Sequence, residues 1–320
     1  MSKYKVKKNK IKFLVLGAHG DIGISICKVI KKSFKNATVE GSDIKSHGMG
    51  DLIFDKVHKI SEPHQNKYKA EIKKIANKFD LIIPSNEKEI YFLSKNNLGI
   101  NEKLLINNFQ IINKFANKIK LNNFLKIYYS NLSLSFCVTS KDFNKIKKKQ
   151  YPLFLKKNMG SGNRGYLVIK NKSEMKKKVD KDTVIQEYLD KDYEEFTCGI
   201  FRARNFTSSI IFKRKLHPSG FTYHAKVYEN NKISKIMENL ANNINLYGSL
   251  NIQFKKKGNK IKVFDINTRL SSTVFFRDLM GFKDLVWWIK DKLKKAYSPK
   301  FNIKNVKNQT IVKIFEDKII

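Results

Sequence analysis

Val263-Phe264-Asp265-Ile266-Asn267-Thr268-Arg269 is the stretch from which the fold and the function of this chain are best inferred. Side chains alternate across a strand, so Asp265, Asn267 and Arg269 are expected on one face. Carboxylate and amide oxygens suit Mg²⁺, which takes its remaining ligands from phosphates and water. A guanidinium beside them suits a phosphoryl group. The stretch therefore predicts a strand that holds a metal and a phosphorylated ligand.

A second strand is expected just ahead, in Ser249 to Phe254, and the residues around Gly258-Asn259 predict a hairpin turn. A three-residue loop, 258–260, would place Gln253 directly opposite Asp265. A two-residue loop would place Gln253 on the other face. We expect the three-residue loop, because it adds an amide oxygen to the metal-binding face.

Length and composition bound the class of protein. The chain has 320 residues, of which 41% are apolar, enough for about two domains with buried cores. No stretch approaches the ~18 apolar residues of a membrane span, and the basic N-terminus runs into a short strand and glycines rather than a signal-peptide core. Cys27, Cys137 and Cys198 lie far apart, which favours a cytoplasmic setting and argues against zinc.

The formal net charge of +37 admits two interpretations. It could mark a surface for RNA or polyphosphate, or it could reflect a general preference for Lys, Asn and Ile. Lysines run from Lys3 to Lys318 without a segregated block, so we favour the second interpretation and expect no specific nucleic-acid partner. Arginine is more informative, because its planar fork grips anions. The arginines are Arg164, Arg202, Arg204, Arg214, Arg269 and Arg277.

Alternating strands and helices are expected in the first third of the chain, which implies a parallel sheet with helices on its faces. The expected strands are 12–16, 38–41 and 80–84, and the expected helices are 21–35, 66–78 and 87–95. Beyond them, helix is expected over 107–150 with a break near 130–135, then strands within 151–169, a helix over 174–179 and a strand over 182–186. Mostly antiparallel strands are expected over 194–266, with helices over 234–246 and 278–296 and a last strand over 310–315.

Gly17-Ala18-His19-Gly20-Asp21-Ile22-Gly23 follows the first expected strand, with Asp43 about twenty residues later. This spacing is typical of dinucleotide-binding folds. The same strand, turn and helix also serve as plain scaffold, which we favour. A dehydrogenase would also want a Tyr-x-x-x-Lys pair, but such matches arise by chance in so Lys-rich a chain.

Two further motifs suit a nucleotide. A strand ending at Lys156 leads into the glycine-rich Asn158 to Tyr166, whose backbone N–H groups could cover a triphosphate; an ordinary hairpin turn is the alternative. Val184 to Leu189 could present backbone groups to an adenine edge, with a carboxylate in Asp192 to Phe196 for the ribose; a solvated acidic turn is the alternative there.

Together these motifs resemble the ATP-grasp superfamily, and most closely its carbamoyl-phosphate-synthase large-chain-like branch. The ordered set carries the resemblance: the glycine motif, Pro84-Ser85-Asn86-Glu87, Asn117-Lys118, Tyr-Pro-x-x-x-Lys with its glycine loop, Gln-Glu-Tyr-Leu, Asn-Ile-Gln, and Asp-Ile-Asn-Thr-Arg. The resemblance implies an α/β fold, a Rossmann-like domain followed by a two-lobed α+β ATP-grasp domain. The implied boundaries are 1–106 for the first domain, 107–189 for the small lobe with linker helices and glycine loop, and 190–320 for the large lobe.

The resemblance also implies residue roles. Lys118 and Lys156 would contact the ATP phosphates, and Arg269 would stabilise an acyl phosphate, which makes Lys156 and Arg269 the catalytic candidates. The remaining roles are Gly160, Ser161, Gly162 and Gly165 over the phosphates, Glu187 and Leu189 on adenine, Glu195 on ribose, with Glu194 as a near alternative, and Gln253, Asp265 and Asn267 on Mg²⁺. Arg214 and Arg277 flank the motif strands in sequence, and we expect them to hold a carboxylate substrate.

Four departures from the family pattern bear on ATP turnover. They are Asp265 in place of Glu, Thr268 in place of Pro, Lys157 where Pro is usual, and Asn117 in place of Asp. None removes a type of metal-binding or phosphate-binding group.

The resemblance implies a cytoplasmic ATP-dependent ligase. It would form an acyl phosphate from a carboxylate and pass it to an amine, releasing ADP and phosphate, with ATP and Mg²⁺ as cofactors and Mn²⁺ as an alternative ion. The expected partners are small-molecule substrates, with no membrane and with a homodimer left open. An NAD(P)-dependent oxidoreductase and a catalytically weak nucleotide-binding protein remain the alternatives.

Overall fold

The computed structural model describes residues 10–160, 166–175 and 181–314. Its contacts divide the chain into two compact units, one ending at Ile106 and the other beginning at Asn107. No helix in the described part of the chain is long and apolar enough to cross a membrane.

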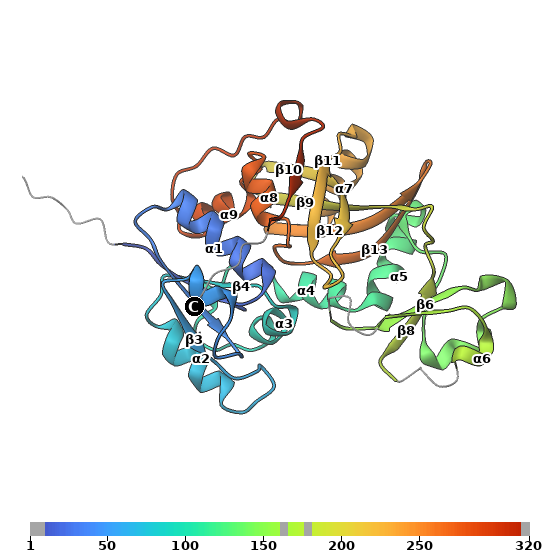
Figure 1. Ribbon diagram of the computed structural model, residues 1–320, viewed down its shortest axis with the longest axis horizontal. Helices are drawn as coiled ribbons and strands as arrows, with labels where there is room; N and C mark the ends of the chain where they lie inside the picture. The colour runs from blue at the N-terminus through green and yellow to red at the C-terminus, as the bar shows by residue number, and fades with distance from the viewer. Residues whose placement is uncertain (1–9, 161–165, 176–180, 315–320) are drawn as a thin grey trace, which may run out of the picture. The chain divides into compact units, whose positions relative to one another are not determined.

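The first unit is a parallel sheet with helices packed on it, in the strand order β3-β2-β1-β4 (Figure 1). Its strands are β1 (Lys12–Leu16), β2 (Thr38–Asp43), β3 (Lys56–Lys59) and β4 (Leu81–Pro84), its helices α1 (Asp21–Ser33), α2 (Tyr68–Ala76) and α3 (Glu87–Lys95), and its 3₁₀ turns η1 (Met49–Leu52) and η2 (Asn101–Lys103). Close packing of α1 on β1 requires glycine, since a Cβ on Gly23 would lie 2.2 Å from the Gly17 carbonyl oxygen.

The second unit contains a large sheet in the order β13-β12-β9-β10-β11-β14, antiparallel throughout. Its strands are β9 (Glu194–Ala203), β10 (Phe206–Leu216), β11 (Thr222–Val227), β12 (Gly248–Lys257), β13 (Lys260–Asn267) and β14 (Thr310–Val312). One face packs on α4 (Phe109–Ala116), α5 (Lys118–Tyr128) and α7 (Asn231–Asn243), through a core that includes Ile252, Phe254, Phe115 and Met237. Helices α8 (Val274–Leu279) and α9 (Asp284–Lys292) follow β13, with η6 (Ile303–Val306) near the end.

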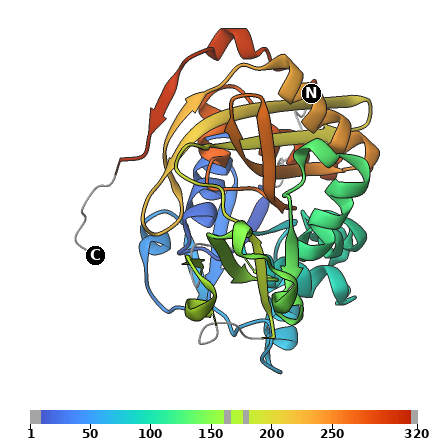
Figure 2. The same cartoon turned by 90° about the vertical axis from the view of Figure 1, so that its right-hand side faces the viewer.

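The second unit also contains a small antiparallel sheet in the order β5-β8-β6-β7, drawn in green in Figure 2. Its elements are β5 (Cys137–Thr139), β6 (Leu153–Lys157), β7 (Leu167–Ile169), β8 (Thr183–Glu187) and α6 (Lys172–Met175), with 3₁₀ turns η3 (Ser130–Leu132), η4 (Ser140–Lys145) and η5 (Lys148–Gln150). Leu153, Leu155, Ile169 and Ile185 form the core on one of its faces.

The expected fold class is confirmed, but several element predictions are wrong. Helix expected across 107–150 ends at Tyr128, and Cys137–Thr139 is instead an edge strand of the small sheet. The helix expected over 278–296 is two helices, because Gly281 adopts a φ of +82° between them. Strand β3 was not expected. Most of the helix expected over 174–179 lies outside the described residues.

Candidate active site

The hairpin of β12 and β13 pairs Gln253 with Asp265, as predicted, but the loop between the two strands is not the predicted one. Lys257 pairs with Lys260, so the loop has two residues rather than three. The register then shifts between Gln253 and Phe254, because Phe254 faces Val263 and Phe264 is left as an extra, bulged residue. The bulge supplies the one-residue offset that we had assigned to the loop.

Gln253, Asp265 and Asn251 share the face of the large sheet opposite its helix-packed core, as strand alternation requires. Asn267 pairs with Asn251 and lies on the same face. The structure thus brings together the residues that the sequence predicts as oxygen ligands.

Lys118 approaches Asp265 most closely, with 2.5 Å between Lys118 Nζ and Asp265 Oδ1. Both residues are buried. Helix α5 begins at Lys118, and the Asn117 side chain caps it by accepting a hydrogen bond from the Lys120 N–H at 2.9 Å. Asn117 therefore does the work of a helix cap, for which Asn and Asp are equally suited. The second oxygen of Asp265 accepts a hydrogen bond from Asn267 Nδ2 at 3.1 Å.

Asp265 stays ionised in this setting. Burial alone would raise the pKa of its carboxyl, but the ammonium groups of Lys118 and Lys156 and the Arg269 guanidinium lower it below its ordinary value. Three cations thus act on one carboxylate. The centre carries an excess of positive charge, as a polyphosphate-binding site requires.

Lys156 reaches this centre from the small sheet. Its Nζ donates to the backbone carbonyl of Phe264 at 3.1 Å, and the ammonium lies 5.8 Å from the centre of the Phe264 ring. Burial and the nearby charge of Lys118 lower the pKa of Lys156 to about 8. The bulge therefore has a second consequence, because the residue that it adds supplies the acceptor for Lys156.

Arg269 follows β13 and is half-buried. Its Nη1 donates to the backbone carbonyl of Leu270 at 2.9 Å, and its charge acts on Asp265.

Arg214 is placed beside the predicted ligand Gln253 rather than turned toward solvent. Its Nη2 lies 2.7 Å from Glu195 Oε1 and 3.0 Å from Gln253 Oε1, and its Nε lies 3.1 Å from the same Glu195 oxygen. The guanidinium is buried. The structure therefore links Glu195 and Gln253 through Arg214. Glu194, the alternative ribose residue, pairs instead with exposed Lys213.

Arg277 has other partners. It is 0% exposed, and its fork binds Asp284, with 3.2 Å from Nε to Oδ1 and 2.8 Å from Nη2 to Oδ2. Its Nη1 donates to the hydroxyls of Ser271 and Thr273. With its fork taken up inside the fold, Arg277 gives no support to the expectation that it binds substrate.

The expected adenine residues lie where β8 ends. Glu187 Oε2 accepts a hydrogen bond from the Ser135 N–H at 2.7 Å. Leu189 is buried against Val184 and Cys137, and its carbonyl accepts a hydrogen bond from Lys255 Nζ at 2.9 Å. In the glycine loop, Gly160 adopts a φ of +115°, whereas Ser161, Gly162 and Gly165 lie outside the described residues.

Two residues of this region were missed in the sequence. Asn158, after β6, receives the backbone N–H of Lys118 on its side-chain oxygen at 3.0 Å, which ties the small sheet to α5. Asn251 is fully buried, and its oxygen accepts from Thr197 Oγ1 at 2.8 Å. Its Nδ2 has no hydrogen-bond partner among the described residues. The Asn-x-Gln spacing was visible in the sequence, but burial was not.

The glycine motif of the first unit is closed by Asp43. One carboxylate oxygen accepts from the His19 N–H and the other from the Lys45 N–H, each at 3.0 Å. The acidic side chain that a dinucleotide-binding site would turn toward a ribose here holds the turn together.

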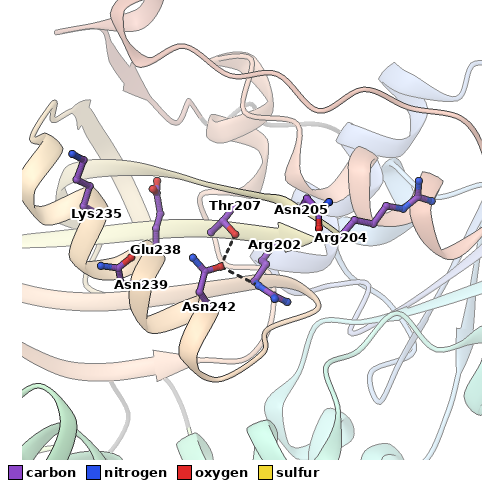
Figure 3. Close-up of a pocket in the computed structure, with 8 residues that line it drawn as sticks. All are labelled: Arg202, Arg204, Asn205, Thr207, Lys235, Glu238, Asn239 and Asn242. Atoms are coloured by element: carbon purple, nitrogen blue, oxygen red, sulfur yellow. Dashed lines mark hydrogen bonds between the residues drawn. The ribbon is translucent and has the colours of Figure 1, made fainter.

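A separate hollow is lined by residues of β9, β10 and α7 (Figure 3). Within it, Arg202 Nε and Thr207 Oγ1 both donate to Asn242 Oδ1, at 3.0 and 2.7 Å. Arg204 also lines it, and its side chain pairs with Asp291. These two arginines therefore have structural partners. No cluster of three or more His, Cys, Asp or Glu side chains suited to a metal occurs in the described ranges.

Comparison with known proteins identifies the fold. Residues 179–315 match the family model described as ATP-grasp in the biosynthetic pathway with Ter operon. No curated protein matches the chain in sequence.

Solved structures resemble the chain over most of its length. The biotin carboxylase domain of 2-oxoglutarate carboxylase from Hydrogenobacter thermophilus, in complex with MgADP, ADP and bicarbonate, is 14% identical and has a TM-score of 0.68, covering 93% of this chain and 73% of its own. N5-carboxyaminoimidazole synthetase from Staphylococcus aureus, complexed with ADP, is 15% identical, with a TM-score of 0.71 and coverage of 91% and 79%. L-amino acid ligase from Bacillus licheniformis is 13% identical, with a TM-score of 0.70 and coverage of 94% and 78%. The chain therefore shares the fold of these enzymes, and its residues 179–315 match an ATP-grasp family model.

Proposed function

We propose that the chain is an ATP-dependent ligase that activates a carboxylate as an acyl phosphate and transfers the acyl group to an amine. One observation carries the proposal: Lys118, Lys156 and Arg269 act together on Asp265, on the hairpin that also bears Gln253 and Asn267. Two of the similar structures hold ADP or MgADP, which supports a nucleotide as the anion that these cations receive.

MgATP would bind between the small and large lobes of the ATP-grasp domain, 107–189 and 190–320, with residues 1–106 as the preceding domain. Lys118 and Lys156 would contact the phosphates under the 160–165 loop. Leu189 would pack on the base, and Glu195 would take the ribose hydroxyls.

Mg²⁺ fits the oxygen atoms of this face. Asp265 offers an ionised carboxylate, and Asn267 turns its Nδ2 toward that carboxylate, which leaves Oδ1 as its ligand atom. Gln253 Oε1 accepts one hydrogen bond, from Arg214, and has a second lone pair. A site with only a few protein oxygens suits Mg²⁺, because this ion takes its remaining ligands from phosphates and water. When bound, Mg²⁺ would neutralise phosphate charge and polarise the γ-phosphoryl group.

The protein's own part in the reaction would be positioning and charge stabilisation. A carboxylate oxygen attacks the γ-phosphorus, and the bond from that phosphorus to the β,γ-bridging oxygen breaks, releasing ADP. The amine nitrogen then attacks the acyl carbon, phosphate leaves with the bonding electrons, and the nitrogen gives up a proton. Arg269 would bind the phosphoryl oxygens. Arg214 would hold Gln253 and Glu195 in place. Arg277, which binds Asp284, is not part of the proposed substrate site.

Release of ADP tests the proposal. Pools of carboxylates and amines are supplied with MgATP, and each pool is omitted in turn. We expect ADP only when both are present, and none from Asp265→Asn, while Asp192→Asn, an exposed carboxylate paired with Lys257, behaves as wild type. ADP release that ignores the substrates and survives Asp265→Asn would contradict the proposal. MgATP binding without ADP release would favour the catalytically weak nucleotide-binding protein.

The oxidoreductase alternative has no specific observation in its favour, since one oxygen of Asp43 accepts from the glycine turn at His19 and the other from the Lys45 N–H. We also propose a cytoplasmic location, because Cys27, Cys137 and Cys198 are all buried free thiols. The substrates would be small molecules, and assembly as a homodimer stays open.

A further inference from the structure

Arg214, on β10, contacts two of the predicted ligand-binding residues at once. Its Nη2 donates to Glu195 Oε1 at 2.7 Å and to Gln253 Oε1 at 3.0 Å, and its Nε donates to the same Glu195 oxygen at 3.1 Å. Its Nη1 lies 3.4 Å from the Thr222 hydroxyl. The Arg214 side chain is only 5% exposed, so packing and these contacts together fix the guanidinium.

The order of the strands explains why this position needs an arginine. Strand β9, which bears Glu195, lies between β10 and β12, and Gln253 belongs to β12. The Arg214 side chain therefore reaches across β9, and its planar fork meets an acceptor from each of the two strands. A lysine ends in a single ammonium nitrogen and lacks this fork.

The contact with Arg214 also sets the orientation of the Gln253 amide. A guanidinium has donors only, so the amide atom that faces it is the oxygen. The amide NH₂ cannot bind a cation, whereas the oxygen keeps a second lone pair for Mg²⁺. Loss of a group that orients a metal ligand typically costs about 10- to 100-fold in metal affinity. Arg214 thus holds Gln253 in the orientation that Mg²⁺ requires.

Glu195 is held by the same guanidinium, but through one oxygen only. Its Oε1 accepts both hydrogen bonds from Arg214, and no hydrogen bond to Oε2 occurs within residues 10–160, 166–175 and 181–314. The Glu195 side chain is 23% exposed, so Oε2 is not sealed inside the fold. One guanidinium therefore supports both the residue proposed for ribose and a residue proposed for Mg²⁺.

Resting on the proposed function, we propose that Arg214 is a positioning residue through which ribose and Mg²⁺ strengthen each other's binding. Ribose hydroxyls that donate to Glu195 Oε2 would hold the carboxylate still, and with it the guanidinium and the Gln253 amide. Mg²⁺ on Gln253 would hold the same three groups from the other end. Conformational freedom lost to the first ligand is not lost again to the second, and linkage makes the effect equal in both directions.

The test compares the affinities of ATP and 2′,3′-dideoxy-ATP by calorimetry, with Mg²⁺ and with EDTA. Wild type should prefer ATP under both conditions, and Mg²⁺ should enlarge the preference by about fivefold or more, as is typical of coupled sites. Arg214→Met should show the same preference with and without Mg²⁺. Arg214→Lys keeps a positive charge beside Glu195 and should fold, but it lacks the fork and should lose the coupling as well.

Two further variants separate positioning from general damage to the site. Arg214→Lys combined with Gln253→Glu should regain most of the Mg²⁺ affinity that Arg214→Lys loses, because a carboxylate presents an oxygen whichever way it turns. The coupling to ribose should stay absent in this double variant. Lys213→Met, next to Arg214 in the sequence and paired with exposed Glu194, should behave as wild type.

A wild-type preference for ATP that Mg²⁺ leaves unchanged overturns the inference. Full coupling in folded Arg214→Met and Arg214→Lys proteins overturns it as well. Both results leave the proposed function standing. If wild type binds neither nucleotide, the proposed function fails and this inference fails with it.

Discussion

At the scale of single residues, Asp265 determines the electrostatics of the site. It is one carboxylate under the influence of three cations, Lys118, Lys156 and Arg269. Its side chain is a methylene shorter than the Glu of the family pattern, yet Lys118 still reaches it at 2.5 Å. The shorter carboxylate therefore still forms a close ion pair with Lys118.

Asp265→Asn should destabilise the folded protein strongly. Lys118 is buried, and removing its counter-ion leaves a buried charge uncompensated, at a cost of about 3–5 kcal/mol in the free energy of unfolding. Urea denaturation of the nucleotide-free protein measures this, with Asp192→Asn as the exposed control, which should leave the midpoint unchanged. Equal stability of Asp265→Asn and wild type would mean that the ion pair has no structural weight.

Lys156 should make nucleotide binding depend on pH. Its folded-state pKa is lowered to about 8, so near pH 8.5 much of it is neutral. Phosphate favours the charged form, and binding should therefore take up a proton. Calorimetry of MgATP at pH 8.5 in buffers of different ionisation enthalpy should detect this uptake, which Lys156→Met abolishes and which exposed Lys157→Met retains. Binding heats that do not vary with the buffer would contradict the assignment.

The lowered pKa of Lys156 also determines how this residue makes the free energy of unfolding depend on pH. Between pH 8 and the ordinary pKa of 10.5 the unfolded chain binds more protons at this lysine than the folded chain does. The contribution of Lys156 to the free energy of unfolding therefore rises with pH through this window.

At the scale of elements, the β12–β13 hairpin depends on the bulge at Phe264. Deleting Phe264 should restore a regular ladder in which Gln253 still opposes Asp265, because the two-residue loop then sets the register by itself. The deletion removes the backbone carbonyl that accepts a hydrogen bond from Lys156, so we expect MgATP binding to weaken while the circular dichroism of the fold persists. Phe264→Leu keeps the residue count and should still bind. Wild-type affinity in a folded deletion variant would contradict a role for the bulge and its carbonyl in placing Lys156.

Elements set by local pattern could be predicted from the sequence, and those set by distant partners could not. Strands β1, β2 and β4 of the parallel sheet and the pairing of Gln253 with Asp265 follow from apolar patterns and turn residues, whereas β3 was not expected. The three-residue loop predicted for this pairing was wrong. The offset comes from a β-bulge, which the alternation of apolar and polar residues in the sequence does not reveal. Strand β5 was missed for a similar reason: Cys137–Thr139 is short, and only pairing with β8 makes it a strand.

Arginine shows the same division among the candidate site residues. Its rarity singled out Arg214, Arg269 and Arg277 alike, but sequence spacing cannot tell which guanidinium has an internal partner. Arg277 has Asp284, seven residues later and across a turn.

At the scale of the whole molecule, the sequence contains two glycine-rich stretches, Gly17–Gly23 in the first unit and 160–165 in the second. The net charge of +37 favours neither, since lysines run through both units. The predicted ligand oxygens and the cations around them belong to the second unit. In the first, Asp43 closes the glycine turn on itself. The central claim is therefore that the nucleotide binds at the Asp265 centre and not at the first glycine turn.

Titration of MgATP into wild type, Lys156→Met and Gly20→Ala tests this claim most directly. Gly20 has an ordinary backbone conformation, and an added Cβ would meet only the Gly17 carbonyl oxygen, at 3.3 Å, so Gly20→Ala should fold. We expect Lys156→Met to weaken MgATP binding roughly tenfold or more, the equivalent of at least ~1.4 kcal/mol, and Gly20→Ala to bind as wild type does. A loss confined to Gly20→Ala would place the nucleotide in the first unit and contradict the account.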